Sequence, residues 1–132
     1  MTQIVAVYTG VLALIFLVLS ARTIQARVSQ RISLGDGDNF EMRSRMRAHA
    51  NFAEYVPIIL LLMWLMAAQG FSSWVIHALG IATVVARVLH PFGLAIKKSP
   101  NPPRFIGATL TLTVLAVAAI LVLLAALAGI RV

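Results

Sequence analysis

The chain has 132 residues, of which 61% are hydrophobic and only 11% are charged. Soluble domains are about a quarter charged and about half apolar, so this composition excludes an ordinary soluble domain and indicates an integral membrane protein. No cysteine is present, which excludes disulfides, zinc–thiolate sites and a catalytic thiol. The net charge is +7, but no basic stretch interleaved with aromatic residues indicates a nucleic-acid partner.

The first predicted membrane span covers residues 4–21, close to the length of about 20 residues that a helix needs to cross the hydrocarbon core. It lacks the basic lead-in and the cleavage site of a signal peptide, so we expect it to be retained. The following connection, ISLGDGDNF, has the residue types of a turn. It lacks the further oxygen ligands and the terminal glutamate of a calcium loop, and the sequence predicts no metal site.

The second predicted span is polar at its start. Its purely apolar run, residues 55–68, covers only about 21 Å at about 1.5 Å per residue, which is too short to cross. Gln69 and Gly70 stop an extension at the far end, so the span must begin near residue 49. This boundary places Asn51 and Glu54 within the thickness of the membrane.

The third predicted span covers residues 74–94, and the fourth covers residues 105–130 and is almost uniformly apolar. We expect His77 either to have a structural role or to face the lipid headgroups, and His90–Pro91 to close the third helix. The connection KKSPNPPR is rich in proline, which ends a helix. The predicted fold is therefore all-α: a single membrane domain, residues 1–132, that forms a bundle of four transmembrane helices.

The basic residues predict the orientation in the membrane. Ten of the eleven Lys and Arg residues flank the first and third connections, which share one side. They are Arg22, Arg27, Arg31, Arg43, Arg45, Arg47, Arg87, Lys97, Lys98 and Arg104; only Arg131 lies on the other side. The positive-inside rule makes the basic side cytoplasmic and puts both termini outside.

One face of the second span carries a polar stripe. Arg43, Arg47, Asn51 and Glu54 follow helical spacing and share that face. Ionisable groups at membrane depth cost about 2.5–3.5 kcal/mol each, so they normally face protein or a wet cavity. The stripe could hold the two ends of a zwitterionic ligand. The alternatives are headgroup anchoring for Arg43 and Arg45, and an interhelix hydrogen bond for Asn51 and Glu54.

Further polar groups lie near the same predicted side of the membrane. Arg87 and His90 are three residues apart on the third span, where His90 could also be a structural interface residue. Arg104 follows Pro102–Pro103 in the first turn of the fourth span, where free backbone N–H groups and a guanidinium favour an anion. Headgroup anchoring is the alternative for Arg104.

The stretch RAHANFAEYVP, residues 47–57, resembles the second-helix signature of the MAPEG family (membrane-associated proteins in eicosanoid and glutathione metabolism). The four spans, the basic first connection, the pattern A-R-x-x-H in the third span and the arginine that begins the fourth are also similar to this family, closest to its short bacterial branch. The resemblance implies a homotrimer in the bacterial inner membrane, with glutathione bound in a U-shape at subunit interfaces near the cytoplasmic face.

The resemblance also assigns roles to individual residues. Those assigned to glutathione binding are Arg47, His49, Asn51, Glu54, Tyr55, Arg87 and His90. Arg104 would match the arginine that stabilises the glutathione thiolate, and either Arg22 or Arg27 would contribute from the first span. Relatives that make leukotriene conjugates have tyrosines where this chain has His90 and Leu94, which disfavours eicosanoid synthesis.

The function that follows is a membrane-bound glutathione transferase or peroxidase acting on small lipophilic electrophiles. The first alternative is a non-catalytic scaffold or lipid-binding protein with the same fold, and glutathione binding would discriminate against it. The second is a small multidrug-type transporter with Glu54 as its proton-coupled site, which substrate uptake that depends on Glu54 would reveal.

Overall fold

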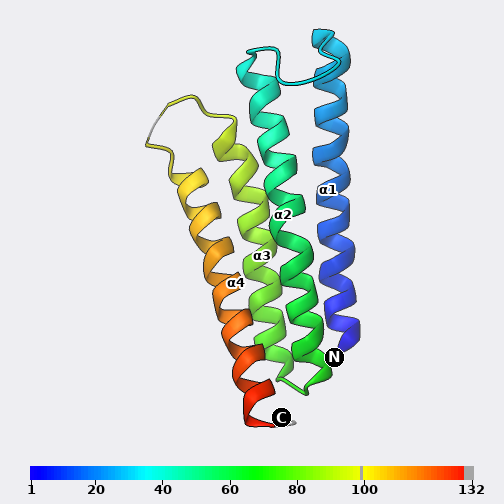
Figure 1. Ribbon diagram of the computed structural model, residues 1–132, viewed down its shortest axis with the longest axis vertical. Coiled ribbons are helices and arrows are strands. Elements are labelled where there is room, and N and C mark those ends of the chain that lie inside the picture. The colour runs from blue at the N-terminus through cyan, green and yellow to red at the C-terminus, as the bar shows by residue number, and fades with distance from the viewer. Residues whose placement is uncertain (99, 130–132) are drawn as a thin grey trace.

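The computed structural model describes residues 1–98 and 100–129 of the chain. Within them lie four long helices: α1 (Thr2–Gln30), α2 (Phe40–Ala68), α3 (Ser73–Leu94) and α4 (Pro102–Ala128). They run alternately up and down, so that α1 begins at the same end of the bundle at which α4 finishes (Figure 1). Each is long and apolar enough to cross a membrane, which confirms the predicted all-α fold with four candidate spans. Residue 130, the predicted end of the fourth span, and Arg131 lie outside the described residues.

At the basic end of the bundle, the helices continue beyond the predicted spans. α1 runs on past residue 21 to Gln30, and α2 begins at Phe40, well before the expected membrane boundary near residue 49. Asn39 caps α2, because its side-chain oxygen accepts a hydrogen bond from the Met42 N–H at 3.0 Å. Asn101 caps α4 in the same way, accepting from the Arg104 N–H at 3.2 Å.

The prediction that His90–Pro91 closes the third helix is wrong, because α3 continues through Pro91 to Leu94. A proline inside a helix removes one backbone hydrogen bond, which packing against neighbouring helices can compensate. Contacts from neighbouring helices hold this last turn. The Ser44 hydroxyl of α2 donates to the Leu94 carbonyl at 2.8 Å, and Gly93 lies directly against the backbone of Arg104 in α4.

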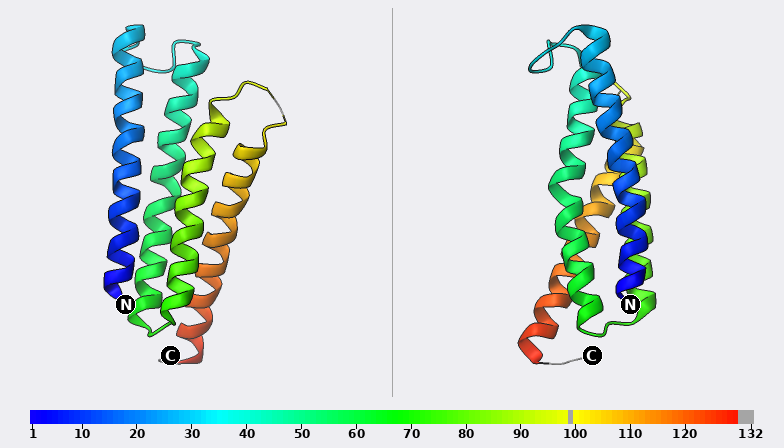
Figure 2. Two further views of the ribbon diagram at one scale, coloured as in Figure 1. Left: turned by 180° about the vertical axis from the view of Figure 1, so that it is seen from behind. Right: turned by 90° about the vertical axis from the view of Figure 1, so that its right-hand side faces the viewer.

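α2 and α3 form the centre of the bundle. Each packs against all three other helices, whereas α1 and α4 lie on opposite sides and do not contact each other within the described residues (Figure 2). One apolar core joins all four helices toward the end where the chain begins: Val5, Ile59, Met63, Met66, Ala67, Ile76, Leu79, Val114 and Ala118. A second core joins α1 to α2: Leu12, Leu19, Ala48, Phe52 and Val56.

Tyr8 and His77 link α1 to α3. The Tyr8 hydroxyl lies 2.8 Å from His77 Nδ1, and the two rings meet edge to face. Gly80 leaves room for the tyrosine, since a Cβ at that position would come within 2.5 Å of the Tyr8 ring. These contacts are the structural role expected for His77.

Two arginine side chains stabilise the connection between α1 and α2. Arg43 pairs with both Asp36 and Asp38, and Arg27 donates to the Gly35 carbonyl at 3.1 Å. The hydrogen bond from Arg43, with a second from the Asp38 N–H, lowers the pKa of Asp36 below its ordinary value. Arg43 is therefore engaged by its own connection and does not join the rest of the polar stripe.

We expect the order of this connection to depend on pH. The carboxylate of Asp36 contributes stability above the unfolded-state pKa of about 3.9, and this contribution is lost as pH falls through the lower folded-state pKa. Amide hydrogen exchange between residues 31 and 39, corrected for the intrinsic rate, should accelerate below about pH 4. In Asp36→Asn the exchange should be fast at all pH values, and a wild-type protein with pH-independent exchange would contradict the role of this pair.

Candidate functional site

The outward face of α2 carries Arg47 and Glu54, and both side chains are exposed. Neither has a hydrogen-bond or ion-pair partner among residues 1–98 and 100–129. Ile58 and Leu61 continue the same face toward the other end and are 51% and 55% exposed. Among the described residues, no other helix covers this face. The face changes from charged to apolar along its length.

Asn51 and Tyr55 lie at the edge of the outward face and are half-buried. The Asn51 carbonyl accepts a hydrogen bond from Nη1 of Arg87, at 3.5 Å. Tyr55 lies close enough to Arg87 to interact with it electrostatically. These contacts connect the polar stripe of α2 to α3.

Arg87 is the most buried charged residue of the cluster, with only 2% of its surface exposed. Its Nη2 donates to the Thr111 hydroxyl and, at 3.4 Å, to the Gly107 carbonyl, both in α4. Its Nε is buried without a partner in the described part of the chain, and no carboxylate there pairs with it. A buried cation without a counter-ion is costly, so the cluster favours a negatively charged ligand.

His90 lies where α2, α3 and α4 meet. It is 5% exposed and packs so closely on α4 that a Cβ at Gly107 would lie 2.9 Å from the His90 Cβ. Arg87, Arg104 and Arg47 all lie close enough to act on His90 electrostatically. The structure therefore brings together four of the predicted site residues: Arg47, Arg87, His90 and Arg104.

Arg104 is exposed in the first turn of α4. Its side chain has no hydrogen-bond partner in the part of the chain that the structure describes, and it borders an open basin with Lys97 and Lys98. Its backbone N–H is not free as expected, because the Asn101 side chain already accepts it. An anion at this position would therefore be bound by the Arg104 guanidinium rather than by the Arg104 backbone N–H.

His49 lies on a different face of α2 from Arg47, because two residues turn a helix by about 200°. Its Nε2 lies 3.1 Å from the Ser20 hydroxyl of α1, and its ring stacks on Phe16 with centroids 4.6 Å apart. Within one chain, His49 is thus separated from Arg47 and Glu54.

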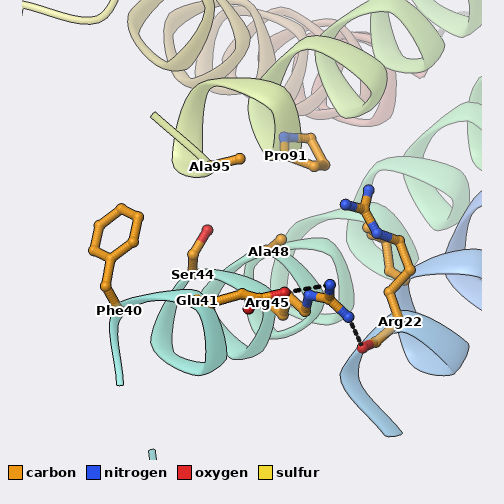
Figure 3. Close-up of a pocket in the computed structure, with 9 residues that line it drawn as sticks. Arg22, Phe40, Glu41, Ser44, Arg45, Ala48, Pro91 and Ala95 are labelled. Atoms are coloured by element: carbon orange, nitrogen blue, oxygen red, sulfur yellow. Dashed lines mark hydrogen bonds and ion pairs between the residues drawn. The ribbon is translucent and has the colours of Figure 1, made fainter. Parts of the chain in front are cut away.

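The structure distinguishes Arg22 from Arg27. Arg27 is tied to Gly35 and to the sulfur of Met46, whereas Arg22 lines a cavity of about 170 Å³ between α1, α2 and the end of α3 (Figure 3). Of the charged residues that line this cavity, Arg45 and Glu41 pair with each other. The Arg22 side chain has no ion-pair partner in the described part of the chain, so it is the arginine of α1 that is available to a ligand.

Three residues around the cluster were not predicted from the sequence. Thr111 and Gly107 accept hydrogen bonds from Arg87, and Asn101 binds the start of α4 to the end of α3. The spacing of Gly107 and Thr111, four residues apart in an apolar helix, is a signal for close helix packing that could have indicated this face.

Comparison with known proteins supports the resemblance seen in the sequence. A model of the MAPEG family matches residues 5–124. The inner membrane protein YecN of Escherichia coli strain K12 is 34% identical over 88 residues, which cover 67% of each chain, and YecN of Escherichia coli O6:H1 matches equally well. The match to the family model spans most of the chain, so this protein belongs to the MAPEG family, which includes glutathione transferases.

Proposed function

We propose that the protein is a glutathione-dependent transferase or peroxidase of the inner membrane, which acts on small lipophilic electrophiles. The observation that carries this proposal is the cluster of Arg47, Arg87, His90 and Arg104, with Glu54 two turns from Arg47 on the same face of α2. Arg87 is buried there without a carboxylate partner among the described residues, although the cluster lies on helices apolar enough to span a membrane.

The charges of the cluster fit the charges of glutathione. Glutathione carries two carboxylates, one ammonium group and one thiol. Arg47 and Arg87 would bind carboxylates, since guanidinium groups suit carboxylates, and Glu54 would bind the ammonium group. Asn51 and Tyr55 would add hydrogen bonds at the edge of the site, and His90 would complete its wall.

The site is proposed to lie between the subunits of a homotrimer. Arg47 and Glu54 would be costly on a lipid-facing surface, and a neighbouring subunit would remove them from lipid. His49 and Arg22 face away from Arg47 in the same chain, so they would reach glutathione only across a subunit boundary. The basic end of the bundle is proposed to be cytoplasmic, with both termini on the opposite side.

The proposed chemistry is activation of the thiol by Arg104. A guanidinium beside the sulfur favours the thiolate and so lowers the pKa of the glutathione thiol. The thiol proton leaves to solvent, and the thiolate forms a sulfur–carbon bond with an electrophile that arrives from the lipid; the electrophile releases its leaving group as an anion or, in an addition, takes up a proton from solvent. With a peroxide as the electrophile, the sulfur attacks one oxygen, the oxygen–oxygen bond breaks, and the other oxygen takes up a proton and leaves as an alcohol or as water. The sulfenic acid of glutathione that results is attacked by a second glutathione, which forms the disulfide and releases water.

We expect Arg104→Ala to bind glutathione but to conjugate a small electrophile at least about 100-fold more slowly than the wild type, because it lacks the charge that stabilises the thiolate. Binding is measured as the rise in melting temperature that millimolar glutathione produces in detergent, and catalysis as the conjugation rate. Arg31→Ala is the matched control, since it removes an exposed arginine from the same end of the bundle at a distance from the cluster.

Other outcomes would redirect the assignment. Equal rates in the wild type and Arg104→Ala would remove Arg104 from the mechanism. Wild-type binding without conjugation would indicate a non-catalytic glutathione-binding protein. No shift in melting temperature at millimolar glutathione would favour the scaffold alternative, and substrate uptake that depends on Glu54 would favour a transporter.

A further inference from the structure

We infer that Asn101 is a positioning residue, which fixes the first turn of α4 and thereby sets where the Arg104 guanidinium lies. This inference rests on the proposed function only for the role of Arg104. The fixing of α4 itself is a separate statement about the fold, and it can be tested without glutathione.

The Asn101 side chain uses both ends of its amide. Its oxygen accepts the Arg104 N–H at 3.2 Å, which is the usual contact of a helix N-cap. Its nitrogen donates to the Gly93 carbonyl, in the last turn of α3, and to the Ile96 carbonyl at 3.3 Å. One side chain therefore joins the backbone of Arg104 to the end of α3.

The packing beside Asn101 is equally tight. Gly93 is buried, and a Cβ there would come within 2.5 Å of the Arg104 Cα. One turn further along α4, Gly107 packs against His90 and accepts from Arg87. The Arg104 backbone is thus held between two attachments to α3, which also carries His90 and Arg87.

The Arg104 side chain, in contrast, has no hydrogen-bond partner in the described ranges. A charged side chain on an immobilised backbone is suited to a ligand, because less ordering remains to be done when the ligand binds. A misplacement of about 1 Å can lower a reaction rate about 100-fold, so loss of the Asn101 amide contacts should affect the thiolate more than the fold.

The test compares Asn101→Ser with Asn39→Ser. Serine keeps an oxygen that can cap a helix in both variants. Asn39 caps α2 but makes no side-chain hydrogen bond to another helix among the described residues, so only Asn101→Ser loses a connection between helices. If Asn101→Ser proves unstable, Asn101→Asp keeps the size of the side chain and also loses the amide donors.

Two measurements separate the fold from the chemistry. The chain has no cysteine, and Phe105 is 71% exposed, so a nitroxide on Phe105→Cys reports the mobility of the first turn of α4. The ultraviolet absorbance of the thiolate, titrated with pH, reports the pKa of the bound glutathione thiol. Asn101→Ser should increase the mobility of the label and raise the pKa of the glutathione thiol toward that of free glutathione. It should also slow turnover by at least about tenfold and by no more than about 100-fold, the effect of a misplacement of about 1 Å. Asn39→Ser should cause none of these changes.

Each result has a distinct meaning. Unchanged label mobility in Asn101→Ser overturns the claim that Asn101 fixes α4. Increased mobility with an unchanged thiol pKa overturns the positioning role and leaves Asn101 a structural residue. A wild-type protein that binds no glutathione overturns the proposed function, while the label still decides whether Asn101 holds α4.

Discussion

Gly93→Ala is expected to lower the free energy of unfolding by about 3 kcal/mol or more, the upper end of the range for overpacked sites. The added Cβ would lie within 2.5 Å of the Arg104 Cα and would also meet the Arg104 backbone nitrogen and Cβ. Those neighbours cannot rotate away, because most of them are backbone atoms that Asn101 holds in place. α3 and α4 would have to separate at the point where the proposed site needs them together.

Gly10→Ala is the matched control for this substitution. Gly10 also lies within a helix, but no heavy atom of a neighbouring described residue comes within 4 Å of the position where its Cβ would be. Alanine there should be neutral or stabilise the protein by up to about 1 kcal/mol, because it reduces the freedom of the unfolded chain. Thermal unfolding in the same detergent measures both variants. Equal stability of the two would show that α3 and α4 are not in the close contact described here.

Thr111→Val is expected to lower the free energy of unfolding by about 1.5–3 kcal/mol, the usual contribution of a hydrogen bond to a charged group. Valine has the shape of threonine but no hydroxyl, so the substitution removes one acceptor from Arg87 and creates no cavity. Among the described residues, the guanidinium would keep only its longer contacts, to Asn51 at 3.5 Å and to Gly107 at 3.4 Å. Glutathione binding should weaken as well, because Arg87 would be held to α4 by its longer contact alone.

Thr113→Val gives the same chemical change two positions along the helix. Thr113 is exposed, and within the described ranges its hydroxyl bonds only to the Thr109 carbonyl of its own turn. Its removal should change the unfolding free energy by less than about 0.5 kcal/mol. A Thr111→Val protein as stable as Thr113→Val would show that the Thr111 hydroxyl does not stabilise Arg87.

The fold was predictable because bilayer thickness limits the choices. Four apolar segments separated by turn residues and prolines leave little but four helices, and the structure has them. The ends of individual helices were harder to predict from the sequence. Pro91 indicates a helix end by its own chemistry, yet α3 continues because Ser44 and the Arg104 backbone hold its last turn, and both come from other helices.

The contacts of the candidate site were also only partly predictable from the sequence. Helical spacing placed Arg47 and Glu54 on one face, and both side chains do point outward from α2. Spacing could not show that Arg43 pairs with two aspartates of its own connection, or that His49 packs against α1. These contacts depend on which residues of other segments lie nearby, and the periodicity of a single helix does not contain that information.

The first turn of α1 and the last turn of α4 lie at one end, far from the arginine-rich tips of the helices (Figure 1). A protein captured on a sensor chip or bead through the first turn of α1 or the last turn of α4 would stand in one orientation, with the basic tips toward the flowing buffer. Every molecule of such a layer would offer the same surface to an added compound.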